Sequence, residues 1–131
     1  MDVKLKKLVE NAVIPTYAKP GDAGMDMTAI VYEYDAEKDC HVYKTGIALE
    51  IPEGYVGLLF PRSSNRKTNA YMCNHVGVVD SGYRGDIAFS FKNRDKIGKI
   101  IIVPYPQISF VEVDELSTSE RGAGGHGSTG S

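Results

Sequence analysis

The chain lacks tryptophan, has only two cysteines, and carries neither an excess of one charge nor a long hydrophobic run. Its 131 residues include 15 basic and 17 acidic side chains, and the net charge of −2 gives no sign of nonspecific nucleic-acid or membrane binding. No apolar run approaches the ~20 residues that span a bilayer. Two thiols are too few for a disulfide framework, which favours a reducing compartment.

Residues 1–7 contain no apolar signal core. We therefore expect a cytoplasmic protein, or one in the cytoplasm or nucleus of a host cell if its source is viral. The length predicts one domain, large enough to bury a core of its own.

The dominant sequence period is two, which is typical of half-buried β-strands. Residues 87–92 alternate large apolar side chains with small or polar ones, and residues 55–60 and 107–113 also predict strands. Residues 99–103 form a continuous apolar run that could be buried on both faces of a sheet. Short strands separated by frequent turns indicate an all-β barrel or sandwich.

Only residues 63–72 favour a short helix, with Ser63 or Ser64 as its N-cap. From residue 117 onward glycine dominates and apolar side chains almost vanish. We therefore divide the chain into a β domain, 1–116, and a flexible glycine-rich arm, 117–131. Such an arm is either a loose terminus or a segment that wraps a polyphosphate, because glycine lets backbone N–H groups approach the oxygens closely.

Residues 77–87 carry the strongest functional signal in the chain. A β-branched pair leads into Asp80, Ser-Gly makes a turn, and Tyr83 precedes a second glycine before a new strand begins. Such a hairpin can direct one carboxylate and one aromatic ring into a small cavity lined by its own backbone, as a nucleoside site requires. An ordinary hairpin with a solvated aspartate is the plainer interpretation of this segment taken alone.

Five segments, in order, resemble the motifs of the homotrimeric dUTPase family. They lie at residues 23–27, at 61–64, at Asn74 with the 77–87 hairpin, at Gln107, and at 121–130. The resemblance implies a distorted jelly roll and a homotrimer with active sites shared between subunits. It also implies Mg²⁺-dependent hydrolysis of dUTP to dUMP and pyrophosphate, which keeps uracil out of DNA and supplies the thymidylate precursor.

Under this resemblance Asp80 is the catalytic residue, which positions the water that attacks the α-phosphorus and also receives the sugar 3′-hydroxyl. Tyr83 would pack on the deoxyribose and leave no room for a 2′-hydroxyl. Asn74 offers a donor and an acceptor to the uracil edge. The remaining base contacts would come from backbone groups of Gly77, Val78, Val79 and Ala88.

Phosphate contacts are expected from Ser63 and Ser64 at a helix start, with Arg62 in the charge network of the site. Arg121 is the candidate for the γ-phosphate because a guanidinium binds two oxygens at once. Asp26 would support the pocket through water, or serve as a buried structural carboxylate. Mg²⁺ would be held by the triphosphate and water, without a direct protein ligand.

Two departures from the family pattern stand out. His126 occupies the place of a phenylalanine that stacks over uracil, and we expect it to contact the substrate together with Gly127 and Ser128. The usual arginine before Gln107 is missing, so any salt bridge made there is in doubt, although Gln107 stays a candidate phosphate contact.

Other functions fit less well. A dCTP deaminase shares this fold, but its proton-shuttling glutamate would stand where this chain has Ser90. A nucleotide-sensing module without turnover would have little need of both Asp80 and the arginine-led arm. A plain β-sandwich interaction domain does not explain why five polar segments converge on one ligand.

Overall fold

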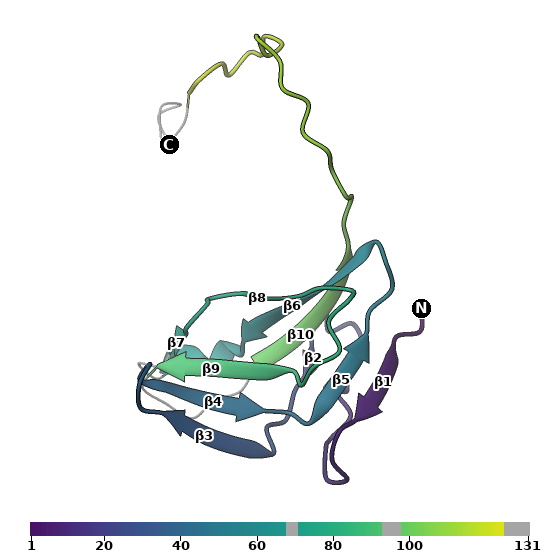
Figure 1. Ribbon diagram of the computed structural model, residues 1–131, viewed down its shortest axis with the longest axis vertical. Helices are drawn as coiled ribbons and strands as arrows, with labels where there is room; N and C mark the ends of the chain where they lie inside the picture. Colours follow the sequence, from purple (N-terminus) through teal and green to yellow (C-terminus); the bar gives the residue numbers. More distant parts are fainter. Residues whose placement is uncertain (68–70, 93–97, 125–131) are drawn as a thin grey trace.

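Two four-stranded antiparallel sheets and a two-stranded ribbon make up the body of the protein (Figure 1). The structure is a computed structural model that describes residues 1–67, 71–92 and 98–124. One sheet has the order β2-β10-β6-β8, the second has the order β3-β4-β9-β7, and β1 pairs with β5. This nearly all-β architecture confirms the expected jelly-roll-like class.

The strand bounds are as follows: β1 (Lys4–Lys7), β2 (Met25–Asp26), β3 (Val31–Asp35), β4 (Cys40–Lys44), β5 (Ile47–Glu50), β6 (Tyr55–Pro61), β7 (Tyr71–Met72), β8 (Gly77–Val79), β9 (Ala88–Lys92) and β10 (Gly98–Pro104). The strands expected at 55–60, 87–92 and 99–103 are therefore present as β6, β9 and β10.

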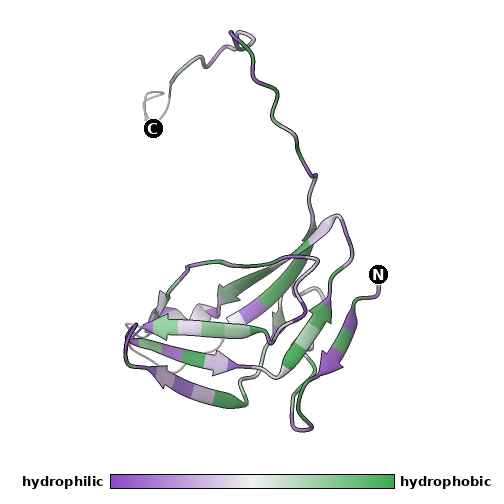
Figure 2. Ribbon diagram, in the orientation of Figure 1, coloured by the Kyte–Doolittle hydropathy of each residue, from purple (hydrophilic) through white to green (hydrophobic). Residues whose placement is uncertain are grey.

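The core lies between the two larger sheets. Phe89 and Phe91 of β9 are 1% and 0% exposed, and they belong to one hydrophobic cluster with Leu59 of β6 and Ile100 of β10. Figure 2 shows the corresponding apolar bands along β6, β9 and β10. In β10 only Gly98 and Ile100 are buried, while residues 101–103 are half-buried, so this strand is not fully covered on both faces as its continuous apolar run had allowed.

The predicted helix at 63–72 is partly wrong. A 3₁₀ helix covers Ser63–Lys67, and Tyr71–Met72 is instead the strand β7, which pairs with β9. The apolar face of β7 explains the difference: Met72 is 2% exposed and belongs to the core, which a continued surface helix would not allow.

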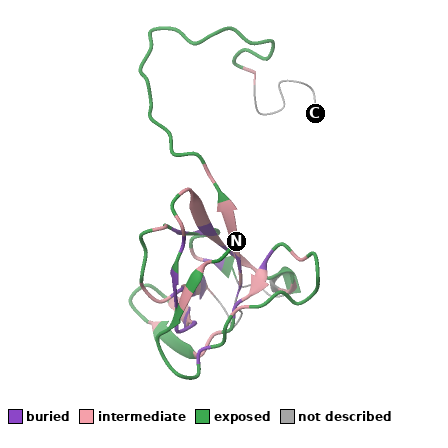
Figure 3. Ribbon diagram, turned by 90° about the vertical axis from the view of Figure 1, so that its right-hand side faces the viewer, coloured by how far each residue is buried: buried purple, intermediate pink, exposed green. Residues whose placement is uncertain are grey.

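The strand predicted at 107–113 is also wrong. The chain leaves the body where β10 ends, and residues 105–124 contain no strand (Figure 1). Figure 3 shows this segment as an exposed extension, with Phe110 at 93% and Leu116 at 87% exposure. The alternating pattern here has no neighbouring strand within the described chain to satisfy its backbone groups.

Within the described residues, no helix has the length and hydropathy that crossing a membrane would need.

Gly98 has no room for a side chain between its neighbouring strand β6 and Phe89 of the other sheet, which yields a stability prediction. A Cβ at this position would lie 2.1 Å from the carbonyl oxygen of Phe60 and 2.4 Å from the ring of Phe89. We expect Gly98→Ala to lower the free energy of unfolding by about 1–3 kcal/mol, because backbone and core must move apart. Thermal melting would measure the loss. Gly82→Ala is the control, since a Cβ there meets nothing within 4 Å, and equal melting temperatures for the two variants would contradict the prediction.

Candidate functional site

A cavity of about 220 Å³ opens between β8, the turn that follows it and the start of β9. Ten residues line it: Leu59, Asn74, Gly77, Val78, Val79, Asp80, Tyr83, Asp86, Ile87 and Ala88. The structure thus brings seven of the predicted site residues to one cavity, although the arm and the phosphate-site residues are not among them.

The cavity exists because β8 is the last strand of its sheet. Its inner side pairs with β6, where Val79 faces Gly57, and its outer side carries no strand within the described chain. Ala88 pairs with Lys44 of β4, while the β7 side of β9 is paired at residues 91 and 92 and accepts one further bond, from Cys73, at Ser90. Two open strand edges therefore face the cavity and leave backbone donors and acceptors free for a planar ligand.

Asp80 lies at the end of β8, where the turn begins. Its main-chain carbonyl accepts a hydrogen bond from the Tyr83 N–H at 3.1 Å, which closes the turn. Its carboxylate is exposed, as is the side chain of Asn74 across the cavity. The site is therefore open to water in a single chain, and a solvent-excluding cover has to come from another segment.

The Tyr83 ring is held by its own turn. Its hydroxyl donates to the main-chain oxygen of Asp86 at 3.0 Å, and the ring remains 47% exposed. The hydroxyl lies over Gly85, where a Cβ would come within 2.4 Å of it. The second glycine of the motif thus leaves room for the ring in this position.

Asp86 anchors the far end of the turn. Its carboxylate oxygen accepts the backbone N–H of Gly46 at 2.9 Å, at the corner between β4 and β5. The neighbouring Thr45 is fully buried, and its hydroxyl donates to the main-chain oxygen of Ile87 at 2.8 Å. A carboxylate bound to a backbone N–H makes a strong, charge-assisted link, so the turn is fixed to the body of the protein.

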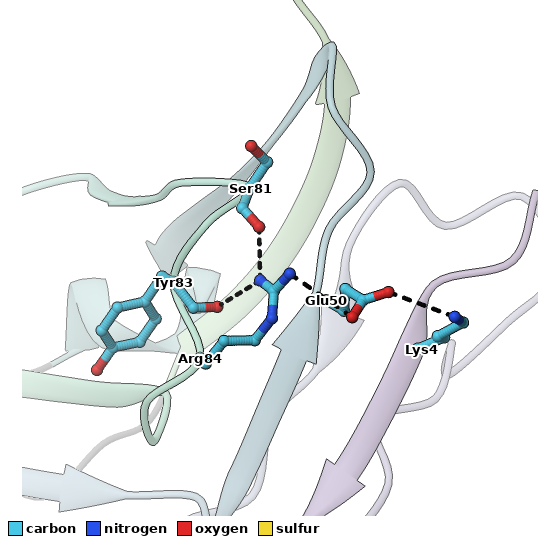
Figure 4. A network of polar contacts seen from close by, with 5 residues as sticks. All are labelled: Lys4, Glu50, Ser81, Tyr83 and Arg84. Atoms are coloured by element: carbon cyan, nitrogen blue, oxygen red, sulfur yellow. Dashed lines mark hydrogen bonds and ion pairs between the residues drawn. The ribbon is translucent and has the colours of Figure 1, made fainter.

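Arg84 fastens the same turn from outside. Figure 4 shows its guanidinium between the main-chain oxygens of Ser81 and Tyr83, with hydrogen bonds of 2.6 and 3.3 Å. It also pairs with Glu50 of β5 at 3.6 Å, and Glu50 pairs with Lys4 of β1 at 3.5 Å. These exposed pairs add little stability individually, but the hydrogen bonds restrain the backbone next to Asp80.

Sequence reasoning missed Leu59, Asp86 and Ile87 in the cavity wall, and Arg84 behind it. The sequence did contain one indication of Asp86: a carboxylate placed directly before a buried strand needs a hydrogen-bond partner. The identity of that partner, Gly46, depends on the fold.

A second polar cluster surrounds Asp26 on β2. One carboxylate oxygen lies 3.6 Å from Nε of Arg62 and 3.6 Å from Nζ of Lys99. The same oxygen is buried and accepts no hydrogen bond from any described residue. Ser63 and Ser64 follow directly at the start of the 3₁₀ helix. Arg62 and both serines do not line the Asp80 cavity of this chain.

Gln107 and Arg121 lie on the exposed extension, and neither lines the Asp80 cavity. The Arg121 guanidinium donates to the main-chain oxygen of Gly124, within the arm itself. His126, Gly127 and Ser128 lie outside the described residues. Across the described ranges, no group of three or more His, Cys, Asp or Glu side chains could hold a metal ion.

Comparisons with known proteins agree with one another. The dUTPase family model matches residues 10–130. Deoxyuridine 5′-triphosphate nucleotidohydrolase of Thermobifida fusca is 38% identical over 98% of this chain and 78% of its own length, and that of Clostridioides difficile is 38% identical over 98% of both. The dUTPase of Staphylococcus bacteriophage 80alpha with dUPNHPP superposes with a TM-score of 0.84 and 26% identity over 99% of both chains.

The contact between Tyr83 and Gly85 yields a site prediction. A Cβ at Gly85 meets the far end of the exposed Tyr83 side chain rather than backbone, so Gly85→Ala should displace the ring without unfolding the protein. If the ring excludes a 2′-hydroxyl, discrimination between dUTP and UTP should fall by about 10-fold or more. Rates of pyrophosphate release with the two nucleotides measure this ratio.

The control is Gly82→Ala in the same turn, where a Cβ meets nothing within 4 Å. It should keep the parent ratio. A ratio that is the same in both variants would refute the sugar-facing role of Tyr83.

Proposed function

The chain belongs to the dUTPase family and is a dUTP nucleotidohydrolase, and on that premise we propose that Asp80 directs the water that splits dUTP into dUMP and pyrophosphate. The observation that carries this proposal is the gathering of Asp80, Asn74 and Tyr83 around one cavity of about 220 Å³. The cavity combines an ionisable carboxylate, a planar amide, an aromatic ring and open strand edges, which suits a nucleoside with a reacting phosphate at its mouth.

The uracil ring would lie between β8 and Ala88. The backbone of Gly77–Val79 offers fixed donors and acceptors along its open edge, and Asn74 adds an amide from the facing turn. Cytosine would present its amino group where uracil presents a carbonyl, so one donor would face another. Backbone groups held by the β6 pairing lose little entropy when they bind the base.

Asp80 would act as the general base. A phosphoanhydride is cleaved when a water lies in line with the leaving group and a nearby carboxylate orients it and takes its proton. Because Asp80 is exposed in the single chain, the reaction needs a cover that excludes bulk solvent. We assign this role to the glycine-rich arm, 117–131, with Arg121 and residues 126–128 reaching the phosphates and the base.

We further propose that the active protein is a homotrimer whose sites are shared between subunits. Three parts of the predicted site, namely Arg62 with the two serines, Gln107 and Arg121, stand apart from the Asp80 cavity within one chain. The extension after β10 carries exposed apolar side chains that require burial, including Phe110 and Leu116. Binding to a neighbouring subunit would bury them and bring the separated parts together.

Magnesium fits this arrangement as an ion carried by the substrate. A D95N mutant dUTPase from phage phi11 of S. aureus, with a TM-score of 0.74 and 28% identity over 88% of this chain and 98% of its own, coordinates a structural Mg(II) ion, a role different from that of an ion carried by the substrate. In this chain the buried, unbonded oxygen of Asp26 could accept a hydrogen bond from an ion-bound water, while Arg62 and Lys99 disfavour direct coordination of a second cation. When bound, Mg²⁺ would spread the charge of the phosphate oxygens.

In the cell, we propose, this activity keeps uracil out of DNA and supplies dUMP for thymidylate synthesis, in the cytoplasm.

The test of the proposed chemistry is pyrophosphate release with Mg²⁺ from dUTP, UTP, dTTP and dCTP. We expect dUTP to be strongly preferred, and Asp80→Asn to reduce kcat by about 10²- to 10⁴-fold, because the amide orients water but cannot accept its proton. Asp2→Asn is the matched control, since Asp2 is exposed and lies outside the cavity. Undiminished turnover by folded Asp80→Asn would refute the role of the carboxylate.

The assembly is tested by light scattering. We expect a mass of three 14.3 kDa chains, and we expect Phe110→Ser to weaken assembly. Phe110 is already 93% exposed in one chain, so this change should matter only if another subunit buries it. Glu112→Ser, an exposed change on the same extension, serves as the control; a monomeric parent protein with full activity would contradict the trimer.

A further inference from the structure

Two free thiols far apart in the sequence meet at one corner of the second sheet. Sγ of Cys40 lies 3.3 Å from Sγ of Cys73, with both residues half-buried. A disulfide holds its sulfurs about 2.05 Å apart and its Cα atoms within about 7 Å, so the sulfurs would have to approach by about 1 Å more and the backbone on either side of β9 would have to move with them. Cys40 also contacts the main-chain oxygen of Lys38 at 3.5 Å.

The sheet explains how the two side chains meet. β4 and β7 both pair with β9, on opposite sides, and Phe91 is the shared partner of His41 and Met72. Figure 1 shows the start of β4, the tip of β9 and β7 converging at this corner. The thiols therefore reach toward each other across β9. Because β7 is a two-residue strand at the sheet edge, it would move when the sulfurs are drawn together.

Movement of β7 would be transmitted to the candidate site. Cys73 donates its N–H to the Ser90 oxygen at 2.9 Å and is followed directly by Asn74, which lines the cavity. The turn after Cys73 is tight, with the His75 N–H donating to the Met72 oxygen at 3.1 Å. Pulling Cys73 toward Cys40 would therefore shift Asn74 relative to Asp80 and Ala88.

We propose that Cys40 and Cys73 are a redox modification site, which closes to a reversible disulfide by exchange with a low-molecular-weight disulfide and thereby alters nucleotide binding. Formation of the disulfide does not depend on the proposed function. The effect of the disulfide on nucleotide binding does rest on the proposed function. A bond that requires β7 to move is strained, and strained disulfides are the readily reduced, regulatory ones.

The chemistry balances with glutathione disulfide as the oxidant. One protein thiolate attacks a glutathione sulfur, forms a mixed disulfide and releases one glutathione thiolate. The second protein thiol loses its proton and attacks the protein sulfur of that mixed disulfide, which expels the second glutathione. Two protein thiols are oxidised by two electrons, and one disulfide is reduced to two thiols.

Burial, together with the contact to Cys40, raises the pKa of the Cys73 thiol, and the nearby Lys92 opposes this shift. Less Cys73 thiolate is therefore present at neutral pH than for an ordinary thiol. The rate of closure should rise as the pH is raised, because the thiolate is the reacting form.

The experiment incubates the full-length, reduced protein with glutathione disulfide, and intact mass and non-reducing peptide maps are then recorded. We expect loss of two hydrogens, no retained glutathione, and a Cys40–Cys73 cross-linked peptide. The KM for dUTP should rise severalfold with a smaller change in kcat, and dithiothreitol should reverse both changes.

Cys40→Ser and Cys73→Ser are the matched controls. Each variant should have the same KM for dUTP before and after treatment with glutathione disulfide. The only change in mass should be that of a mixed disulfide on the remaining thiol. If the wild-type protein retained glutathione on both thiols, or if neither thiol reacted, the proposal of a Cys40–Cys73 disulfide would be refuted. An intramolecular bond with unchanged KM would overturn its effect on binding. If the reduced protein did not hydrolyse dUTP, the proposed function would fail while the mass still reported on the bond.

Discussion

The packing of β9, in the second sheet, against the first sheet is the constraint on which the rest of the structure depends. Phe89 and Phe91 point inward and are almost completely buried, so the period of two turns Ala88 toward the opposite face. This burial fixes the orientation of the whole strand, because a slip by one residue would expose both rings. Gly98, which has no side chain, leaves room for the Phe89 ring.

The site is formed by β9 and by the turn after β8, which is held to the body of the protein by several hydrogen bonds. The Asp86 carboxylate joins the turn to the Gly46 corner, while Arg84 holds the turn backbone from the solvent side. Between these restraints Asp80 stays open to water. The protein thus combines a restrained cavity wall for the base and sugar with an opening at Asp80 that is exposed to solvent. This arrangement suits a reaction in which a charged substrate must enter before solvent is excluded.

Local patterns predicted local structure well. Residues 87–92 form the expected strand because their alternation coincides with a real two-faced environment. The same pattern at residues 107–113 failed, since a strand also needs a neighbour and this segment has none within the described chain. The strand, turn and strand around Asp80 were predictable because they are contiguous, but the predicted hairpin was wrong: β8 pairs with β6, and β9 pairs with β4 and β7 in the other sheet. Asp86 was missed because its partner, Gly46, lies 40 residues away in sequence, where no local pattern can identify it. Arg84 bonds its own turn, but its ion pair with Glu50 also depends on the fold.

The hydrogen bond from the Tyr83 hydroxyl to Asp86 has one more implication. The phenol proton is already donated, so the hydroxyl has no proton left for a ligand and the ring presents mainly carbon to the sugar. The Tyr83 ring would then discriminate between nucleotides by the size of the sugar substituent that faces it. Nucleotide analogues would be ranked by the bulk of the substituent at the sugar's second carbon, with fluorine tolerated better than a methoxy group, whatever their polarity.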